Sequence, residues 1–148
     1  MNQRKGIILA GGSGTRHTSP PATVPAALIE LLRQQPQLVF SVLVGSQATG
    51  NTHTGSDWDI ALQWAPEVNW MDILGQTEAL RAQLAQALSV APQTIDLIDL
   101  RRANLAMRAA VAEEGVPLTG TDGLAWMHFL QRTWHELEQH YWEQQHAA

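Results

Sequence analysis

The sequence predicts an α/β fold, in which a mixed sheet carries helices mainly on one of its sides. Short apolar runs with the length of buried strands alternate with longer segments whose apolar residues recur every three or four positions. Glycine and proline separate these segments, as they separate strands from helices in folded domains. The 148 residues suffice for one domain with a substantial core.

The first half of the fold is predicted to run helix, strand, loop, strand. Pro25 suits the first turn of a helix that continues to about residue 35, where Pro36 ends it. Residues 38–44 form an almost continuously apolar strand, as expected at a buried central position of a sheet. After a loop rich in Gly, Thr and Asn, the second strand covers residues 57–64.

The second half alternates in the same way. A helix over residues 70–88 is followed by a third strand over residues 94–100 and by a helix over residues 101–114, which Gly115 stops. Residues 116–118 are expected to add a short edge strand. The core stripe of the helix over residues 70–88 is predicted to be Ile73, Leu74, Leu80, Leu84 and Leu88.

A last helix is predicted from a cap at Thr121 or Asp122 to about residue 144. Its apolar residues follow a spacing typical of a coiled-coil seam, and further aromatic residues lie outside that seam. One face can therefore pack on the sheet while a second binds a partner protein, although an ordinary core helix with two apolar sides explains the pattern equally well. The seam is Met127, Leu130, Trp134, Leu137 and Tyr141, and Trp126, Phe129 and Trp142 lie outside it.

The composition argues against several classes of protein. A net charge of −5 and a pI of about 5.6 disfavour a nucleic-acid-binding protein with a broad basic face. Without cysteine the chain forms no disulfides and no Cys-ligated zinc site, which suits the cytoplasm. We expect no membrane span, because no apolar stretch reaches about 18 residues. We expect no signal peptide, because the apolar run at residues 7–10 is too short.

The residues that could carry chemistry lie around the loop between the first two strands. Gly45-Ser46 ends the first strand, and Asp57 and Asp59 open the second after ten intervening residues. Alternation along a strand places the two aspartates on one face, where their like charges favour a shared cation. Oxygen-only ligands favour Mg²⁺ or Mn²⁺ over zinc, and a Gly-Ser turn after a strand exposes N–H groups that can hold phosphate. The combination indicates nucleotide chemistry.

This run resembles the signature of the polymerase-beta-type nucleotidyltransferases, in particular their smallest members, the minimal nucleotidyltransferases. Those proteins carry Gly-Ser, a similar interval, Asp-x-Asp and a third carboxylate on a later strand. Asp96 matches the third carboxylate, and Asp99 is its rival, three residues on and hence on the opposite face of the strand. The resemblance covers roughly residues 25–120 and implies a polymerase-beta-like core.

The resemblance also implies a mechanism. AMP would be transferred from ATP, with Gly45 and Ser46 binding the nucleotide phosphates. Asp57, Asp59 and Asp96 would be the catalytic residues and would hold two Mg²⁺ ions.

The segment from Gly45 to Asp59 departs from the family pattern at Thr49, where many relatives have arginine. A cationic phosphate contact is missing there, which puts nucleotide affinity or rate in question more than metal binding. His53, in the same loop, is interpreted as a substrate contact or, equally well, as a solvated loop residue. The cations that could replace the missing one are Arg81, Arg101, Arg102 and Arg108.

Minimal nucleotidyltransferases of this size are often antitoxins that silence a helical HEPN-type ribonuclease toxin by transferring AMP to it. The resemblance thus implies a HEPN-type toxin as partner and ATP as substrate. Two alternatives stay open. One is an adenylyltransferase for a small molecule such as an antibiotic, working as a homo-oligomer that builds the acceptor site. The other is an antitoxin that neutralises its partner by binding alone.

Residues 1–24 stand apart from this fold. The run IILAGGSGTR at residues 7–16 resembles the opening phosphate loop of sugar-1-phosphate nucleotidylyltransferases, but nothing downstream continues that pattern. We interpret residues 1–24 as an extension, a misassigned start or an expression remnant that is poorly ordered. The nucleotidyltransferase domain then covers residues 25–120, and residues 121–148 form a C-terminal helix for packing or partner binding.

Overall fold

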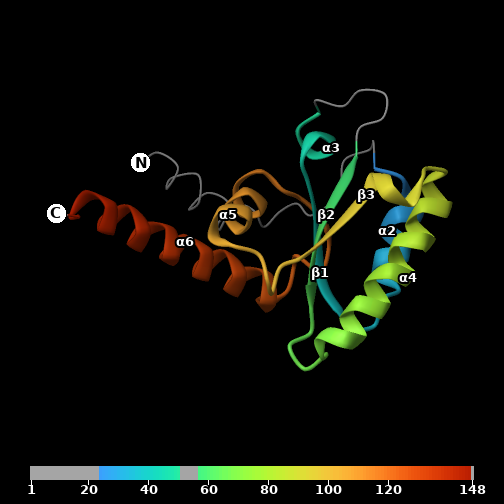
Figure 1. The fold of residues 1–148 in the computed structure, drawn as a ribbon, viewed down its shortest axis with the longest axis horizontal. Helices are drawn as coiled ribbons and strands as arrows, with labels where there is room; N and C mark the ends of the chain where they lie inside the picture. The colour runs from blue at the N-terminus through green and yellow to red at the C-terminus, as the bar shows by residue number, and fades with distance from the viewer. Residues whose placement is uncertain (1–23, 51–56, 148) are drawn as a thin grey trace.

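The computed structural model of the chain describes residues 24–50 and 57–147. It has a central sheet between two groups of helices and a long C-terminal helix that reaches away from the sheet (Figure 1). Each of the predicted strands lies within one residue of its expected ends. The elements are α2 (Ala26–Arg33), β1 (Leu38–Val44), α3 (Ser46–Thr49), β2 (Trp58–Trp64), α4 (Trp70–Leu88), the 3-10 turn η1 (Pro92–Thr94), β3 (Ile95–Asp99), α5 (Leu105–Glu114), β4 (Val116–Thr119) and α6 (Leu124–Gln145).

The strands form one mixed sheet in the order β3-β2-β1-β4. β1 pairs antiparallel with β2 and with β4, and β2 pairs parallel with β3. β1 therefore lies inside the sheet, as its apolar sequence predicts, and β4 is an edge strand. The prediction of a mixed α/β sheet is confirmed.

Helices cover both faces of this sheet, so the prediction that they lie mainly on one side is wrong. On one face, which we call the α2/α4 face, α2 and α4 pack over Ile60, Leu62 and Trp64. On the other, the α5/α6 face, α5 and α6 pack over Val42 and Ala61 (Figure 1). The physical reason is the sequence of β1, because a strand with almost no polar positions must bury both of its faces.

The predicted core stripe of α4 is wrong at one position. Ile73, Leu80 and Leu84 are buried, and Leu88 is partly buried against the same core. Leu74 is 51% exposed. It follows Ile73 by one residue, which turns its side chain about 100° around the helix and away from the sheet.

The last two helices begin later than predicted. α5 begins at Leu105 rather than at Arg101, and the Asn104 side chain caps it by accepting the Met107 N–H at 2.9 Å. α6 begins after Gly123, which makes no side-chain cap, and neither of the two predicted caps starts it. Asparagine before an apolar run is a helix-start signal that apolar spacing alone does not reveal.

α6 packs on the sheet through Trp126 and Phe129, which lie outside the predicted seam, and through only part of the seam itself, namely Leu130 and Trp134. The ring of Phe40 on β1 lies 5.1 Å from that of Trp126 and 5.6 Å from that of Phe129. The seam residues Met127 and Tyr141 are instead 37% and 50% exposed. Stacked and edge-to-face rings bury large areas, so they determine which face of the helix docks. The last turns of α6 extend beyond α5 (Figure 1).

Two further predictions concern the N-terminal extension and membrane-spanning helices. Val24, assigned to the N-terminal extension, is buried in the core of the α2/α4 face. The Gly-rich run at residues 7–16 lies outside the described residues. Within the described ranges, no helix combines the length and the apolar character needed to cross a membrane.

Candidate active site

Gly45 follows β1 and precedes α3, beside the beginning of β2. Its φ of +76° and ψ of −159° lie in a region that essentially only glycine adopts. A Cβ atom at this position would stand 2.3 Å from Oδ2 of Asp59. Glycine is therefore required twice, by the backbone conformation and by the close approach of Asp59.

The turn that follows Gly45 is short and well defined. Ser46 is the first residue of α3, and the N–H groups of Ala48 and Thr49 donate to the Gly45 carbonyl oxygen at 3.0 and 3.1 Å. Gly50 ends the turn with a φ of +83°. The sequence thus folds Gly45-Ser46 tightly against β2. The loop over residues 51–56, with His53, lies outside the described residues.

Asp59 and Asp96 are direct partners across neighbouring parallel strands. They stand opposite each other in the register of β2 and β3, and Val44 stands opposite Asp59 on β1. Ala61 and Ile98, two positions further along each strand, pack into the core of the α5/α6 face. Because residues two apart share a face of a strand, Asp59 and Asp96 both lie on the α5/α6 face.

Negative charge accumulates around Asp59. Burial raises the pKa of its carboxyl group, and the charges of Asp96 and Asp57 raise that pKa further. Asp59 is half-buried, whereas Asp57 and Asp96 are exposed. Such an arrangement favours a bound cation or proton. As the side chains stand, no group of three or more Asp, Glu or His within residues 24–50 and 57–147 could hold a metal ion.

Asp99, the rival third carboxylate, lies on the other face of β3. Its register partner is Leu62, whose side chain belongs to the core of the α2/α4 face. Its Oδ1 accepts the N–H of Arg101 at 3.0 Å, which closes the turn after the strand. The register therefore pairs Asp96, and not Asp99, with Asp59.

The arginines considered as substitutes for a cation at Thr49 have different surroundings. Arg81 on α4 donates to the carbonyl oxygen of Ile95, the residue before Asp96, so its contact is adjacent to a predicted site residue. Arg102 is exposed after the end of β3. The remaining two make contacts elsewhere, Arg101 with the Val68 carbonyl oxygen at 2.9 Å and Arg108 with Glu136 at 2.6 Å.

A family model described as polymerase beta, nucleotidyltransferase matches residues 26–123. The chain belongs to the polymerase-beta nucleotidyltransferase family. The matched range contains the Gly45-Ser46 turn and the aspartates at positions 57, 59 and 96. The family resemblance predicted from these residues is confirmed.

Two curated relatives of this chain are named protein adenylyltransferase MntA. The relative from Shewanella oneidensis is 37% identical over 95 residues, which cover 64% of this chain and 63% of that protein. The relative from Aphanizomenon flos-aquae is 30% identical over 107 residues, which cover 70% of this chain and 71% of that protein. The match therefore spans somewhat less than two thirds of the first relative's length.

Solved structures share the fold of this chain. A toxin-antitoxin crystal structure with AMP-PNP aligns with a TM-score of 0.64 and 31% identity, over 80% of this chain and 90% of that chain. A tri-AMPylated Shewanella oneidensis HEPN toxin in complex with an MNT antitoxin aligns with a TM-score of 0.57 and 28% identity, over 80% and 87% of the two chains. The predicted polymerase-beta-like core is confirmed.

Proposed function

We propose that this nucleotidyltransferase moves AMP from ATP to a hydroxyl group of a partner protein and thereby acts as the antitoxin of a HEPN-type toxin. The observation that carries the proposal is the register pairing of Asp59 with Asp96 beside the Gly45 turn. The relatives support the reaction and the partner, because they are named protein adenylyltransferases and one similar structure contains a tri-AMPylated HEPN toxin. Another similar structure, a toxin-antitoxin crystal structure with AMP-PNP, supports ATP as the donor of the AMP group.

The roles of the site residues follow from their chemistry. Gly45, without a side chain, lets the backbone approach the phosphates of ATP, and Ser46 offers a hydroxyl and an N–H group to them. Asp57, Asp59 and Asp96 would hold two Mg²⁺ ions once their side chains turn toward a shared ion, since carboxylate oxygens are the donors Mg²⁺ prefers. Burial and, after it, the charges of Asp96 and Asp57 raise the pKa of the Asp59 carboxyl group, and a bound cation would relieve this cost. Bound Mg²⁺ supplies charge stabilisation for the triphosphate and acidifies the acceptor hydroxyl.

The reaction is an in-line displacement at the α-phosphorus of ATP. The acceptor oxygen forms a bond to this phosphorus, the bond to the oxygen bridging to the β-phosphate breaks, and pyrophosphate leaves. We assign Asp96 as the group that takes the proton of the acceptor hydroxyl, because its carboxylate is exposed and so accessible to another protein. The Gly45-Ser46 turn holds the leaving pyrophosphate.

Labelled ATP tests the proposal. With Mg²⁺ and the wild-type chain, we expect label on the protein encoded beside this one, and none with the Asp57→Ala, Asp59→Ala double variant. Asp96→Asn should lose the transfer, whereas the matched variant Asp72→Asn, at an exposed position of α4 over the opposite face of the sheet, should keep it. If the wild type leaves this partner unlabelled while a working toxin-antitoxin pair is labelled in parallel, the proposal is wrong.

Thr49 stands where many relatives have arginine, so a cationic contact to the nucleotide phosphates is missing there. This departure favours a second candidate, an antitoxin that neutralises its partner by binding alone. If the double variant neutralises the toxin as well as the wild type does, transfer is dispensable and this candidate is correct. A small-molecule acceptor is the third candidate. Adenylylation of an aminoglycoside by the purified chain, without label on the partner protein, would support it.

We also propose a cytoplasmic location. The absence of cysteine supports it, and cell fractionation tests it.

A further inference from the structure

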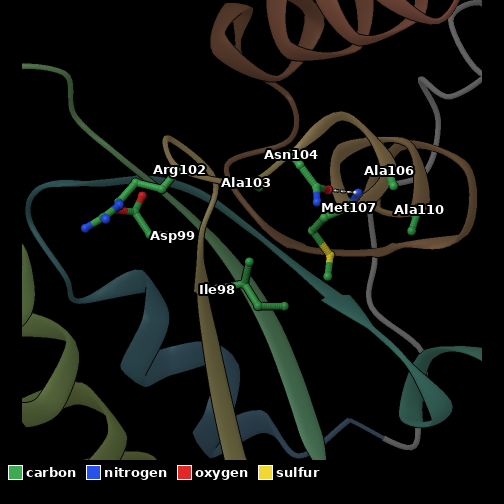
Figure 2. Close-up of a pocket in the computed structure, with 8 residues that line it drawn as sticks. All are labelled: Ile98, Asp99, Arg102, Ala103, Asn104, Ala106, Met107 and Ala110. Carbon is green, nitrogen blue, oxygen red and sulfur yellow. Dashed lines mark hydrogen bonds between the residues drawn. The ribbon is translucent and has the colours of Figure 1, made fainter.

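An open groove lies between β3 and α5 on the α5/α6 face (Figure 2). Its volume is about 550 Å³, and its walls are mainly apolar, with Ile98 on the strand and Ala106, Met107 and Ala110 on the helix. The cap that Asn104 provides for the Met107 N–H fixes the start of the helical wall (Figure 2). The small alanine side chains leave the groove open.

The groove lies two strand positions from Asp96, which is not itself one of its lining residues. Ile98 follows Asp96 by two positions on the same strand and the same face, a step of about 6.6 Å. Asp96 in turn stands opposite Asp59. The polar lining residues are Asp99 at the end of β3, Arg102 in the turn after it and Asn104 before α5. Figure 2 shows Asp99 and Arg102 apart from the helical wall. Ile98, an apolar lining residue, is therefore the part of the groove on β3 that shares a face with Asp96.

The position of the groove relative to the phosphate turn indicates what it binds. β2 lies between β3, which carries Asp96, and β1, which ends before Gly45. An in-line displacement places the acceptor and the leaving pyrophosphate on opposite sides of the α-phosphorus. With pyrophosphate at the Gly45-Ser46 turn, the acceptor approaches from the side of β3, where the groove lies.

We propose that this groove binds the segment of the partner protein that carries the acceptor hydroxyl. An aliphatic or aromatic side chain of that segment lies between Ile98 and the alanines of α5, and the hydroxyl beside it reaches Asp96. Apolar walls suit such a side chain, whereas a triphosphate needs charged or N–H groups that the apolar part of the lining does not supply. The inference rests on the proposed function, because it locates the acceptor of that reaction.

Filling the groove tests this assignment. Ala106 is an exposed helical position, so Ala106→Trp obstructs the groove without removing a core side chain. Ala87→Trp is the matched control, because Ala87 is also exposed and lines a groove of about 510 Å³ between α2 and α4, which cover the opposite face of the sheet.

The assay uses labelled ATP as donor and the protein encoded beside this chain as acceptor. We expect Ala106→Trp to raise KM for the partner about tenfold or more, and Ala106→Leu to raise it less. Both variants should leave KM for ATP within about twofold of the wild-type value, which also shows that they are folded. Ala87→Trp should change neither constant.

Three results would contradict the inference, and they are distinguishable. Equal partner KM values for Ala106→Trp, Ala87→Trp and the wild type would show that the groove does not receive the acceptor. A higher KM for ATP with an unchanged KM for the partner would assign the groove to the nucleotide instead. Absence of transfer by the wild type itself would overturn the proposed function, and the inference with it, before any variant is compared.

Discussion

The two faces of the sheet differ in how completely helices cover them. On the α2/α4 face, Ile60, Leu62 and Trp64 of β2 are at most 1% exposed. On the α5/α6 face, the strand positions nearest the glycine turn are Asp59, which is half-buried, and Asp96, which is exposed. Because alternate residues of one strand serve opposite faces, β2 buries Ile60, Leu62 and Trp64 in one core, whereas its other set of side chains buries Ala61 and presents the Asp59 carboxylate.

Under the proposed function, stability and catalysis are divided between neighbouring residues of the same strand. Asp59 is held half-buried among like charges, which is unfavourable for its ionised form. Ile60, the next residue, is fully buried in the opposite core and offsets that cost. Functional sites often carry such a local cost, which the rest of the fold compensates.

The largest expected effect is that of Asp59→Asn on catalysis. The change removes a charge that the site is built to present, so we expect the rate of AMP transfer to fall on the order of 10³-fold. The stability of the ligand-free protein should rise, because burial and the charges of Asp96 and Asp57 no longer oppose an ionised group. Single-turnover labelling and thermal unfolding measure the two effects. A variant that is less stable than the wild type would show that Asp59 has a structural role.

Ile60→Ala is expected to lower the stability of the fold while leaving the rate of AMP transfer unchanged. This change leaves a cavity in the fully buried α2/α4 core, and we expect a loss of roughly 2–5 kcal/mol in the free energy of unfolding. The folded fraction should transfer AMP at the wild-type rate, because the carboxylates lie on the other face. Urea unfolding and rates measured below the unfolding midpoint test this. A loss of rate as large as that of Asp59→Asn would mean that the faces are not independent.

The sequence predicted the strands and their roles better than it predicted the helices. Apolar runs bounded by glycine or proline located each strand in the part of the chain that the structure describes, and alternation placed Asp96 and Asp99 on opposite faces. The side of the sheet that each helix covers depends on packing between distant segments, which local spacing does not contain. The docking face of α6, for example, is set by the rings of Trp126 and Phe129 against Phe40.

Gly45→Ala is expected to have an intermediate effect. The backbone conformation costs on the order of 1–3 kcal/mol for a residue with a side chain, and the new Cβ would meet Asp59 Oδ2 at 2.3 Å. We therefore expect lower stability together with weaker ATP binding by calorimetry. Gly50→Ala is the matched control, because its φ is +83° but nothing lies within 4 Å of the added atom. If both variants bind ATP equally, the contact with Asp59 is not important.

The site illustrates a second limit of sequence reasoning. The motif identified Gly45 and Asp59, but the need for glycine at position 45 comes from a contact between two strands that are joined by a loop. The groove beside Asp96 carries no motif at all, because Ile98, Met107 and alanine are ordinary core residues in the sequence. Only the arrangement of α5 over β3 shows that these residues line an open groove.

The smallest expected effect concerns the ion pair that joins α5 to α6 on the less covered face. Arg108 donates to Glu136 at 2.6 Å, and the two side chains are 12% and 41% exposed. This hydrogen bond lowers the pKa of Glu136 from its ordinary value of 4.5. A lowered pKa means that the pair stabilises the fold fully above pH 4.5, and that this contribution is lost as the pH falls through the lowered pKa.

Glu136→Gln should therefore cost no more than about 1 kcal/mol near neutral pH, because the glutamate is well exposed to solvent. The difference in unfolding midpoint between variant and wild type should narrow as the pH falls below 4.5. Glu30→Gln is the matched control on α2, where the pair with Arg33 is exposed on both sides and should contribute nothing measurable. A Glu136→Gln difference that stays constant into the acidic range would mean that this residue joins α5 to α6 by packing rather than by charge.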